Sequence, residues 1–379
     1  MGVASSRGPA GDEPDVAFMR RALALAENGL GLAAPNPMVG AVVASAAGDV
    51  VGEGWHEGQG TRHAEVMALD AAGDLTRGGT LYTTLEPCSH QGRTPPCAPR
   101  IADSGVARVV AGARDPNPVV DGRGFGILRD RGVEVVEGIL REEADELIAG
   151  FARHVLTGNP LVTLKMAASL DGKVAARDGS SQWTTSEEAR RDVHRLRARA
   201  GAVMIGAGTA VADRPRLTVR LDGYRGRQPV RIVMDSSGRT PADGPLFDGS
   251  APTLMVTTGR APKDAVAGWE AVGAEVWVAG DGAIRLSESP LFEFLYDRWK
   301  VQEVLVEGGP TLAWSLLDEG IVDRVVLYLA PKLIGGESAP GILGGKGIDS
   351  LADALALENV RIERIGPDLK VVADVHRDR

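Results

Sequence analysis

Short apolar runs alternate with amphipathic helical segments along most of the chain, and this alternation restricts the possible folds more than any other feature. In the first half the apolar runs are "MVGAVVA" (38–44), "TLYTTLEP" (80–87) and "ARVVAGA" (107–113). In the second half they include "LVTLKMAAS" (161–169), "VRIVMDS" (230–236) and "EVLVEGG" (303–309). Strands separated by helices favour a mainly parallel sheet with helices on its faces. We therefore expect an α/β fold.

The length of 379 residues predicts more than one domain. The turn "TGNP" (157–160) ends a helical pattern, and a new strand pattern follows it. We therefore expect domains at 15–157 and 158–379, after a disordered polar leader at 1–14. The start "MGVASS" also fits the loose myristoylation pattern at Gly2 and Ser6. Because that pattern is so loose, a plain polar leader is the favoured interpretation.

Charge and hydropathy argue against a nucleic-acid or membrane partner. The net charge is −9 and no block of Lys and Arg stands out, whereas a protein that grips a nucleic-acid backbone usually carries a basic stripe. The sequence contains no apolar run of membrane-spanning length and no signal-peptide core near its start. We expect a soluble, cytoplasmic protein that acts on small molecules.

The only two cysteines, Cys88 and Cys97, lie in "LEPCSHQGRTPPC" (85–97). In a reducing compartment such a pair is more often a metal or catalytic pair than a disulfide. Upstream, His63 opens a helical segment, and Glu65 follows two residues later. One imidazole and two thiolates are a suitable ligand set for catalytic zinc, with the fourth position open to water.

The same residues match the zinc-deaminase pattern H-x-E followed by P-C-x-x-C. They depart from it in one respect, because eight residues separate Cys88 from Cys97 where the pattern has two. A carboxylate next to the metal can take a proton from the attacking water and pass it to the leaving amine. We therefore predict that Glu65 is a proton shuttle and not a ligand.

In the second half, "VLVEGGPTLAWSLL" (304–317) predicts a strand that runs into Gly308 and Gly309 and then into a helix. Backbone N–H groups at such a helix start can hold a phosphate or pyrophosphate. From the residues alone, a phosphate cradle and a plain strand–helix turn are equally compatible with this segment.

Taken together, the motifs resemble the bifunctional deaminase–reductases of riboflavin biosynthesis, over nearly the whole chain from about residue 14. The resemblance is carried by "APNPMVGAVV", "HAEVMAL", "TLEPCSHQGRTPPC", "LKMAASLDGKVA", "GAGTAVADRPRLTVR", "LVEGGPTL" and "LYLAPKLIGG". It implies an N-terminal cytidine-deaminase-like three-layer domain with Zn²⁺, and a C-terminal dihydrofolate-reductase-like domain that uses NADPH.

The resemblance also implies the reactions and the partners. The first is hydrolytic deamination of diaminohydroxyphosphoribosylaminopyrimidine. The second is NADPH-dependent reduction of the ribosyl group of 5-amino-6-(5-phosphoribosylamino)uracil to ribityl. Partners are these phosphorylated pyrimidines and further copies of the chain, associated through the reductase domain.

Carried over by position, the resemblance assigns the individual site residues. It implies the zinc ligands His63, Cys88 and Cys97, the proton shuttle Glu65, and the deaminase pocket residues Asn36, His56, His90 and Arg93. The implied NADPH contacts are Ala167, Trp183, Thr209, Asp213, Ser236, Gly309, Pro310, Thr311, Leu312, Ala313, Trp314 and Ser315. The implied substrate contacts of the reductase are Ser181, Arg197, Leu217, Arg220 and Glu307.

In this interpretation Arg197 and Arg220 fork onto the 5′-phosphate of the substrate, and Trp183 forms an apolar wall beside the nicotinamide. Simpler alternatives are a solvated helix face for Arg197, a core position for Trp183 and a solvated loop for His56. The turn-rich segment that begins "DPNPVVDG" (115–122) is expected to be structural.

Two rival functions remain. The first is a nucleoside or nucleic-acid cytidine-type deaminase with an unrelated C-terminal domain, against which the net charge and the long cysteine gap argue. The second is a binding module with a purely structural zinc ion. Structural zinc usually has four protein ligands, so three ligands beside Glu65 argue against it.

Overall fold

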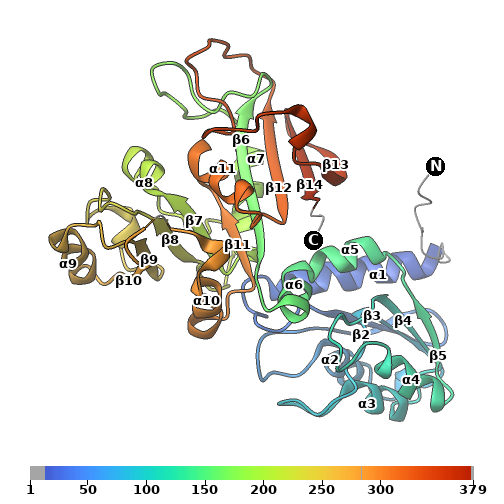
Figure 1. The fold of residues 1–379 in the computed structure, drawn as a ribbon. Helices are drawn as coiled ribbons and strands as arrows, with labels where there is room; N and C mark the ends of the chain where they lie inside the picture. Colours follow the sequence, from blue (N-terminus) through green and yellow to red (C-terminus); the bar gives the residue numbers. More distant parts are fainter. Residues whose placement is uncertain (1–12, 283, 377–379) are drawn as a thin grey trace. The chain divides into compact units, whose positions relative to one another are not determined.

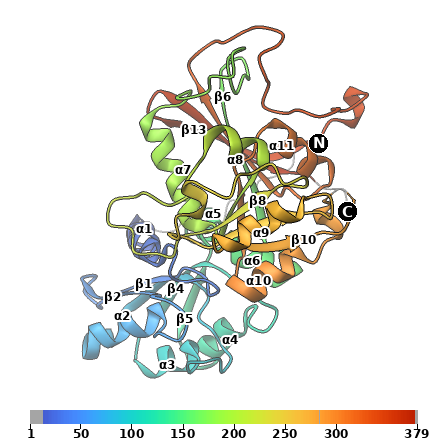
Figure 2. The ribbon, with the colours of Figure 1, turned by 90° about the vertical axis from the view of Figure 1, so that its left-hand side faces the viewer.

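The computed structural model describes residues 13–282 and 284–376. Gly2, Ser6 and nearly all of the expected leader lie outside this part of the chain. The chain forms two compact units, Met1–Gly158 and Asn159–Arg379, which can be followed by colour in Figure 1 and Figure 2. None of the described helices combines the length and the apolar character that crossing a bilayer requires.

The first unit is a five-stranded sheet between two layers of helices. The strands, in the order β2-β1-β3-β4-β5, are β2 (Val50–Trp55), β1 (Gly40–Ala44), β3 (Thr80–Leu85), β4 (Arg108–Ala113) and β5 (Glu134–Glu137). The helices are α1 (Glu13–Ala26), α2 (Ala64–Ala72), α3 (Cys97–Asp103), α4 (Arg123–Asp130), α5 (Arg141–Leu147) and α6 (Ala149–Thr157). Helices α1 and α5 cover one face, and α2, α3 and α4 cover the other (Figure 1).

Alternation along the buried strands builds both halves of this core, because successive side chains of a strand point to opposite faces. Val42 packs in one cluster with Met19 of α1. Its neighbour Val43 packs in the other cluster with Ala68 of α2. These strands are apolar on both faces because both faces are covered.

The sheet of the first unit is mixed, which corrects the expectation of a mainly parallel sheet for this half. Strand β1 pairs antiparallel with both β2 and β3, and only the β3–β4 and β4–β5 pairs are parallel. Strand β2 was not expected from the sequence, because Gly52 and Gly54 interrupt its apolar pattern. A Cβ on Gly52 would lie 2.1 Å from the carbonyl oxygen of Ala68, and one on Gly54 2.3 Å from that of Ala64. The glycines therefore let α2 lie directly on β2.

The second unit contains a nine-stranded sheet in the order β10-β9-β8-β7-β11-β6-β12-β14-β13. The strands are β6 (Leu161–Ser169), β7 (Ala202–Gly206), β8 (Val230–Met234), β9 (Thr253–Thr257), β10 (Glu275–Val278), β11 (Glu303–Val306), β12 (Arg324–Ala330), β13 (Leu357–Ile365) and β14 (Asp368–Val375). All neighbouring pairs from β10 to β12 are parallel, whereas β14 pairs antiparallel with β12 and β13. The expected mainly parallel sheet is therefore correct for this half.

Helices cover both faces of the large sheet. They are α7 (Glu187–Arg199), α8 (Ala207–Asp213), α9 (Lys263–Ala271), α10 (Leu291–Trp299) and α11 (Pro310–Asp318). Leu295 of α10 and Leu316 of α11 belong to the core on one face, and Trp269 of α9 belongs to the core on the other. The N-cap of α7 is Ser186, whose Oγ accepts a hydrogen bond from the N–H of Ala189 at 3.2 Å.

Candidate active sites

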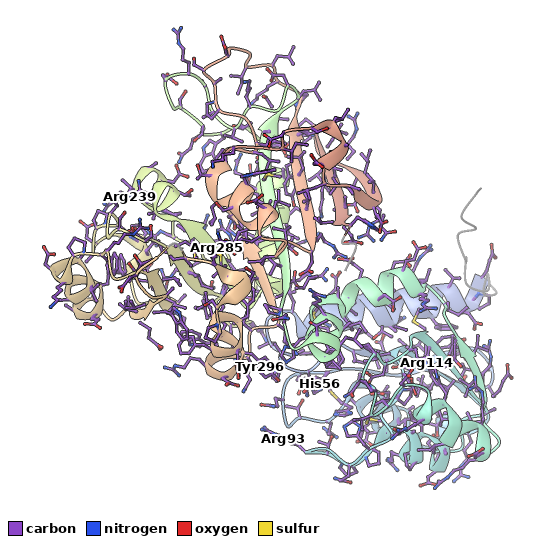
Figure 3. The ribbon with its side chains drawn as sticks, in the orientation of Figure 1. His56, Arg93, Arg114, Arg239, Arg285 and Tyr296 are labelled. Carbon is purple, nitrogen blue, oxygen red and sulfur yellow. The ribbon has the colours of Figure 1, made fainter. Side chains whose placement is uncertain are left out.

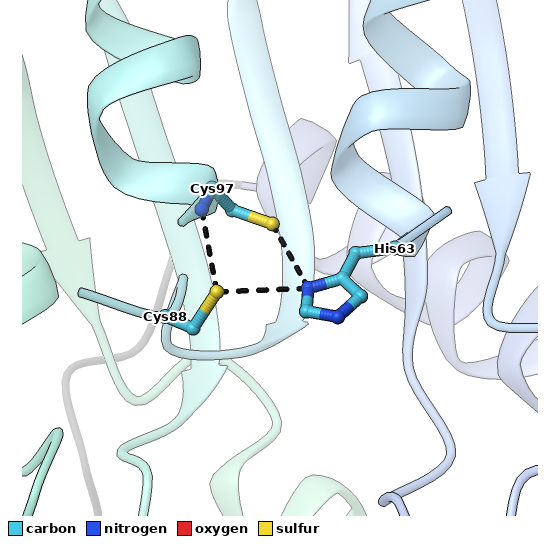
Figure 4. A group of neighbouring side chains, drawn as sticks. All are labelled: His63, Cys88 and Cys97. Atoms are coloured by element: carbon cyan, nitrogen blue, oxygen red, sulfur yellow. Dashed lines mark hydrogen bonds between the residues drawn. The ribbon is translucent and has the colours of Figure 1, made fainter. Parts of the chain in front are cut away.

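The three predicted zinc ligands meet at one end of the sheet of the first unit. His63 directly precedes α2, Cys88 lies in the loop after β3, and Cys97 is the first residue of α3. His63 Nδ1 lies 3.1 Å from Cys97 Sγ and 3.6 Å from Cys88 Sγ (Figure 4). All three ligand atoms lie within 4.8 Å of one another. Both thiols are free, so the disulfide alternative does not apply.

The electrostatics of this triad suit a cation. The pKa of Cys88 is lowered to about 4, chiefly because the Cys97 thiol donates a hydrogen bond to it and secondarily because His63 lies beside it, although burial opposes the shift. The hydrogen bond that the Cys97 thiol donates to Cys88 raises the pKa of Cys97, and burial raises it further. One imidazole and two sulfurs that converge in this way match the donor set of catalytic zinc.

Glu65 lies in the first turn of α2 and is 4% exposed. Burial raises the pKa of Glu65 to about 7, and the charge of Cys88 adds to this effect. A carboxyl group with such a pKa can both accept and release a proton near neutral pH. Glu65 therefore has the acid–base properties that a proton shuttle requires.

A cavity of about 270 Å³ opens beside the triad, and the structure brings all four predicted pocket residues into its wall. Asn36 Nδ2 lies 2.9 Å from His56 Nε2, and His56 is 3% exposed, which rules out the solvated-loop alternative for this histidine. Arg93 projects from the exposed segment between the two cysteines, while His56 lies inside the unit (Figure 3). The cavity therefore combines a polar interior with a cationic residue in its wall.

Sequence reasoning missed several polar residues of this cavity, among them Asp115 and Asn117, whose segment it treated as structural. Asp115 follows β4, which runs parallel to β3. Since the carboxyl ends of parallel strands meet at one edge, polar residues after β4 belong beside those after β3, and this placement was the available signal. Burial raises the pKa of Asp115 to about 6, and its Oδ1 accepts a hydrogen bond from the N–H of Asn117 at 2.8 Å.

Glu86 connects this segment to the cysteine loop. It is 2% exposed, and its carboxylate accepts hydrogen bonds from the N–H groups of Gly122 and Gly124, both at 2.9 Å. A further backbone N–H, that of Asp115, lies 3.3 Å from the same carboxylate. Glu86 precedes Cys88 by two residues, so the start of α4 and the Asp115 loop are tied to the loop that carries Cys88.

In the second unit, the predicted reductase residues gather at the carboxyl ends of adjacent strands. Strands β7 and β11 are neighbours in the sheet. The chain continues from β7 to β8 in one direction along the strand order, and from β11 to β12 in the other. Such a switch point is where open α/β sheets bind ligands. Gly309 is the N-cap of α11 and has no capping side chain, with Pro310 in the first turn. The first N–H groups of α11 are thus available to an anion.

The cofactor residues implied by the resemblance surround this edge. Ala167 lies on β6, Ser236 follows β8, Thr209 and Asp213 lie on α8, and the run from Pro310 to Ser315 begins α11. A Cβ on Gly309 would lie 3.5 Å from Thr209 Oγ1, so α8 and α11 start side by side. A backbone edge with helix N-termini and little side-chain bulk fits the pyrophosphate of a nucleotide. Ala313 is fully buried, which leaves its backbone as the part that a cofactor could contact.

The aromatic and polar residues of the neighbouring loop are exposed. Trp183 is 64% exposed, so the core-tryptophan alternative is wrong, and the guanidinium carbon of Arg190 lies 4.6 Å from the centre of a Trp183 ring. Ser181 is exposed, whereas Leu217 is buried and has a φ of 53°. The loop thus presents an apolar ring and a hydroxyl to the solvent.

Arg197 is buried, which rules out a solvated helix face, and its guanidinium is directed at Glu307. Nε lies 2.5 Å from Oε1 and Nη2 lies 3.0 Å from Oε2, while Nη1 donates to the carbonyl oxygen of Thr218 at 3.0 Å. Lys165 Nζ lies 3.7 Å from Glu307 Oε2. Burial works to raise the pKa of Glu307, but the charges of Arg197 and Lys165 outweigh burial and hold this pKa at about 2.

The sequence assigned the guanidinium of Arg197 to the substrate phosphate. In this structure its partner is instead the carboxylate of Glu307. Arg220 is exposed and lies in the same neighbourhood, with its Nη1 at 3.4 Å from Thr218 Oγ1. The N–H of Arg220 donates to His194 Nδ1 at 3.3 Å. Of the two arginines, Arg220 is the one whose side chain is open to a ligand.

These features are typical of a two-domain enzyme. Its first domain has the fold of a zinc-dependent deaminase, with the triad of His63, Cys88 and Cys97 beside the buried Glu65, and its second domain has the fold of an α/β reductase. Two family models match accordingly. Residues 12–113 match the zinc-binding region of cytidine and deoxycytidylate deaminases, and residues 160–371 match the RibD C-terminal domain.

Full-length relatives extend this match. The chain is 41% identical to the riboflavin biosynthesis protein RibD of Bacillus amyloliquefaciens, over 96% of the chain and 99% of that protein. It is also 41% identical to RibD of Escherichia coli, over 94% and 98%. Two solved structures, RibD of Acinetobacter baumannii and a deaminase/reductase of Thermotoga maritima, superpose with TM-scores of 0.80 and 0.79 at 34% and 36% identity. Each superposition covers 96% of this chain and 99% of the other. The chain belongs to the RibD family.

Proposed function

We propose that His63, Cys88 and Cys97 bind the zinc ion of a deaminase in the first unit and that Glu65 is its proton shuttle. As a member of the RibD family, the chain is a bifunctional enzyme of riboflavin biosynthesis that uses Zn²⁺ and NADPH. It deaminates diaminohydroxyphosphoribosylaminopyrimidine and reduces 5-amino-6-(5-phosphoribosylamino)uracil, the two activities that the name of the Thermotoga maritima protein states. We place the functional division at the turn after Thr157, where α6 ends.

In the deaminase, each residue has a distinct task. Bound zinc lowers the pKa of a water molecule towards neutrality and so supplies the nucleophile. Glu65 would take one proton from this water and pass it to the ring nitrogen as the oxygen adds to the carbon. It would then carry the second proton of that oxygen to the amino group, which leaves as ammonia as the carbonyl forms. Asn36 and His56 hold the pyrimidine inside the cavity. His90 and Arg93 contact the ribosyl phosphate at its outer wall, where an exposed cation attracts an anion.

In the reductase, NADPH supplies the hydride that reduces the sugar carbon of the substrate. The start of α11 would hold the pyrophosphate of this cofactor, and Trp183 and Ala167 would contact its nicotinamide part. Arg220 binds the 5′-phosphate and Ser181 and Leu217 contact the substrate. Glu307 stays anionic beside Arg197 and Lys165 and accepts hydrogen bonds from the sugar hydroxyls.

One observation supports the deaminase assignment most strongly: three ligand atoms lie within 4.8 Å of one another, with the buried Glu65 in the adjoining helix turn. The test is to give the purified, zinc-loaded protein the diaminopyrimidine phosphate with and without NADPH. Ammonia should be released in both samples, and NADPH should be consumed only when substrate is present. Ammonia release from cytidine alone would support the cytidine-deaminase alternative and contradict this proposal.

We also propose that copies associate through the second unit. Strand β13 is the edge of the nine-stranded sheet, and Leu357, Val360 and Ile362 on it are 47%, 55% and 67% exposed. An edge strand with exposed apolar residues is a common site of association. Ile362→Lys should shift the protein to a smaller species in sedimentation; an unchanged sedimentation coefficient would contradict the proposal.

Two free thiols among the proposed zinc ligands suit a reducing compartment, which supports a cytoplasmic location.

A further inference from the structure

The two ring nitrogens of His63 face different partners. Nδ1 points towards the sulfurs of Cys88 and Cys97 (Figure 4). Nε2, on the other side of the ring, lies 3.1 Å from Thr94 Oγ1. Thr94 belongs to the segment between the two cysteines and lines the same cavity as His63. This contact was not among the roles expected from the sequence.

Metal binding decides the direction of this hydrogen bond. A histidine that binds a metal through Nδ1 presents a lone pair there, so the proton of the neutral ring must sit on Nε2. Nε2–H then donates to Thr94 Oγ1, because the threonine oxygen has lone pairs that can accept. Partners of this kind fix the tautomer and the orientation of a ligating imidazole and make it a better ligand.

The backbone on both sides of Thr94 restricts where its hydroxyl can lie. Pro95 follows Thr94, and a residue before proline is held in an extended conformation. Pro96 is the N-cap of α3, and the N–H of Cys97 donates to Cys88 Sγ at 3.3 Å. On the other side, the N–H of Gly92 donates to the carbonyl oxygen of Thr94 at 3.3 Å. These contacts close a turn around Thr94 and tie the end of the segment to Cys88.

We propose that Thr94 is a positioning residue for the zinc ligand His63: its hydroxyl oxygen accepts the Nε2 hydrogen bond and holds Nδ1 towards the metal. This inference rests on the proposed zinc site. It also gives the eight-residue gap between the cysteines a chemical task, because this segment carries Thr94 to the Nε2 side of the His63 ring. Thr94 acts through His63 and takes no part in the proton transfers assigned to Glu65.

The test is a rate of zinc loss that does not depend on catalysis. The parent chain and the variants Thr94→Val and Thr94→Ser are loaded with Zn²⁺, and transfer of the metal to a coloured chelator is followed. Valine keeps the shape of threonine without the oxygen, whereas serine keeps the oxygen. Loss of an outer-shell partner typically weakens metal affinity by about 10–100-fold, so Thr94→Val should lose zinc that much more readily. Thr94→Ser should stay close to the parent.

Gln91→Ala is the matched control, because Gln91 is an exposed residue of the same segment whose side-chain amide donates to the neighbouring carbonyl of Gly92. It should retain zinc as the parent does. Parental zinc retention by Thr94→Val would overturn the inference, and so would equal losses by the serine and valine variants, since the hydroxyl would then not be responsible. A parent chain that binds no zinc would instead overturn the zinc site itself, a result that precedes any comparison of variants.

If the valine variant does not fold, the deaminase kinetics of Thr94→Ser and Thr94→Ala together decide the matter. A positioned His63 predicts that Thr94→Ser retains the parental kcat and the parental acid limb of the pH profile. Thr94→Ala, which removes both the methyl and the hydroxyl group, should lower kcat with little change in KM. Equal kcat values for the alanine variant and the parent would contradict the proposal.

Discussion

Arg197 and Glu307 form a buried two-point ion pair at the carboxyl end of β11, with Nε–Oε1 at 2.5 Å and Nη2–Oε2 at 3.0 Å. Their side chains are 11% and 9% exposed. The parallel fork arrangement is the strongest geometry that an arginine and a carboxylate can adopt. It keeps Glu307 ionised inside the protein and fixes the position of its oxygens beside Lys165.

The first prediction concerns this pair. Arg197→Met should destabilise the second unit by about 3–5 kcal/mol, because it leaves a buried carboxylate without its main partner. The double variant Arg197→Met with Glu307→Leu should be less destabilised than Arg197→Met alone, since the unpaired buried carboxylate is removed, even though Lys165 loses its partner. Urea unfolding followed by tryptophan fluorescence measures this, because only Trp55 lies outside the second unit. A double variant less stable than Arg197→Met alone would contradict the expectation.

The second prediction concerns pH. Burial, with the charges of Arg197 and Arg220, lowers the pKa of His194 from 6.5 to about 4. Between these two values the unfolded chain binds more protons than the folded chain, so stability must fall as the pH falls from about 6.5 to about 4. Above pH 6.5 this contribution is fully present.

His194→Gln removes the titration but keeps an acceptor for the Arg220 N–H. Its unfolding midpoint, measured by tryptophan fluorescence, should depend less on pH in this window than the midpoint of the parent. Identical slopes for the two proteins would show that other groups cause the acid destabilisation.

The third prediction tests Glu65. Glu65→Gln should lower the rate of deamination by about 10²–10⁴-fold, the usual contribution of a general acid–base group. Zinc content should not change, because Glu65 is not among the three converging ligand atoms. NADPH consumption on the deaminated substrate should match the parent and serves as the internal control. Ammonia release at the parental rate would exclude the proton-shuttle role.

The fourth prediction uses two glycines of α4. A Cβ on Gly124 would lie 1.9 Å from the carbonyl oxygen of Pro87, beside the Glu86 carboxylate, whereas one on Gly126 would meet no atom within 4 Å. Gly124→Ala should therefore cost about 1–3 kcal/mol through overpacking and slow deamination by displacing the cysteine loop. Gly126→Ala should instead stabilise the helix by about 0.5–1 kcal/mol.

Hydrogen exchange of peptides from residues 115–130 separates the two outcomes. Faster exchange is expected in the Gly124 variant, and equal or slower exchange in the Gly126 variant. If both variants exchanged like the parent, the tight approach of α4 to Pro87 would not matter for stability.

Much of the protein follows from local sequence patterns. The α/β class, the family and the pairing of a deaminase with a reductase are confirmed by the comparisons, because each rests on motifs whose residues lie close together in the chain. His63, Cys88 and Cys97 converge as their motif predicts, since a helix start and the end of a neighbouring strand lie at one sheet edge. The roles of the individual site residues stay predictions.

Other features depend on contacts between distant segments, and only the tertiary structure decided them. Strand β2 could not be recognised from the sequence, because Gly52 and Gly54 interrupt its apolar pattern. Only the tertiary structure shows that these glycines allow α2 to pack closely on the strand. Arg197 has a carboxylate partner 110 residues away, which no local pattern could indicate. Asp115 reaches the cavity because it follows β4, whose carboxyl end lies beside that of the parallel strand β3. Thr94 reaches it because the segment between the two cysteines lies at the same edge of the sheet. Local spacing determined which groups are available for chemistry, and long-range packing decided which of them meet, because burial and charge act through space and not along the chain.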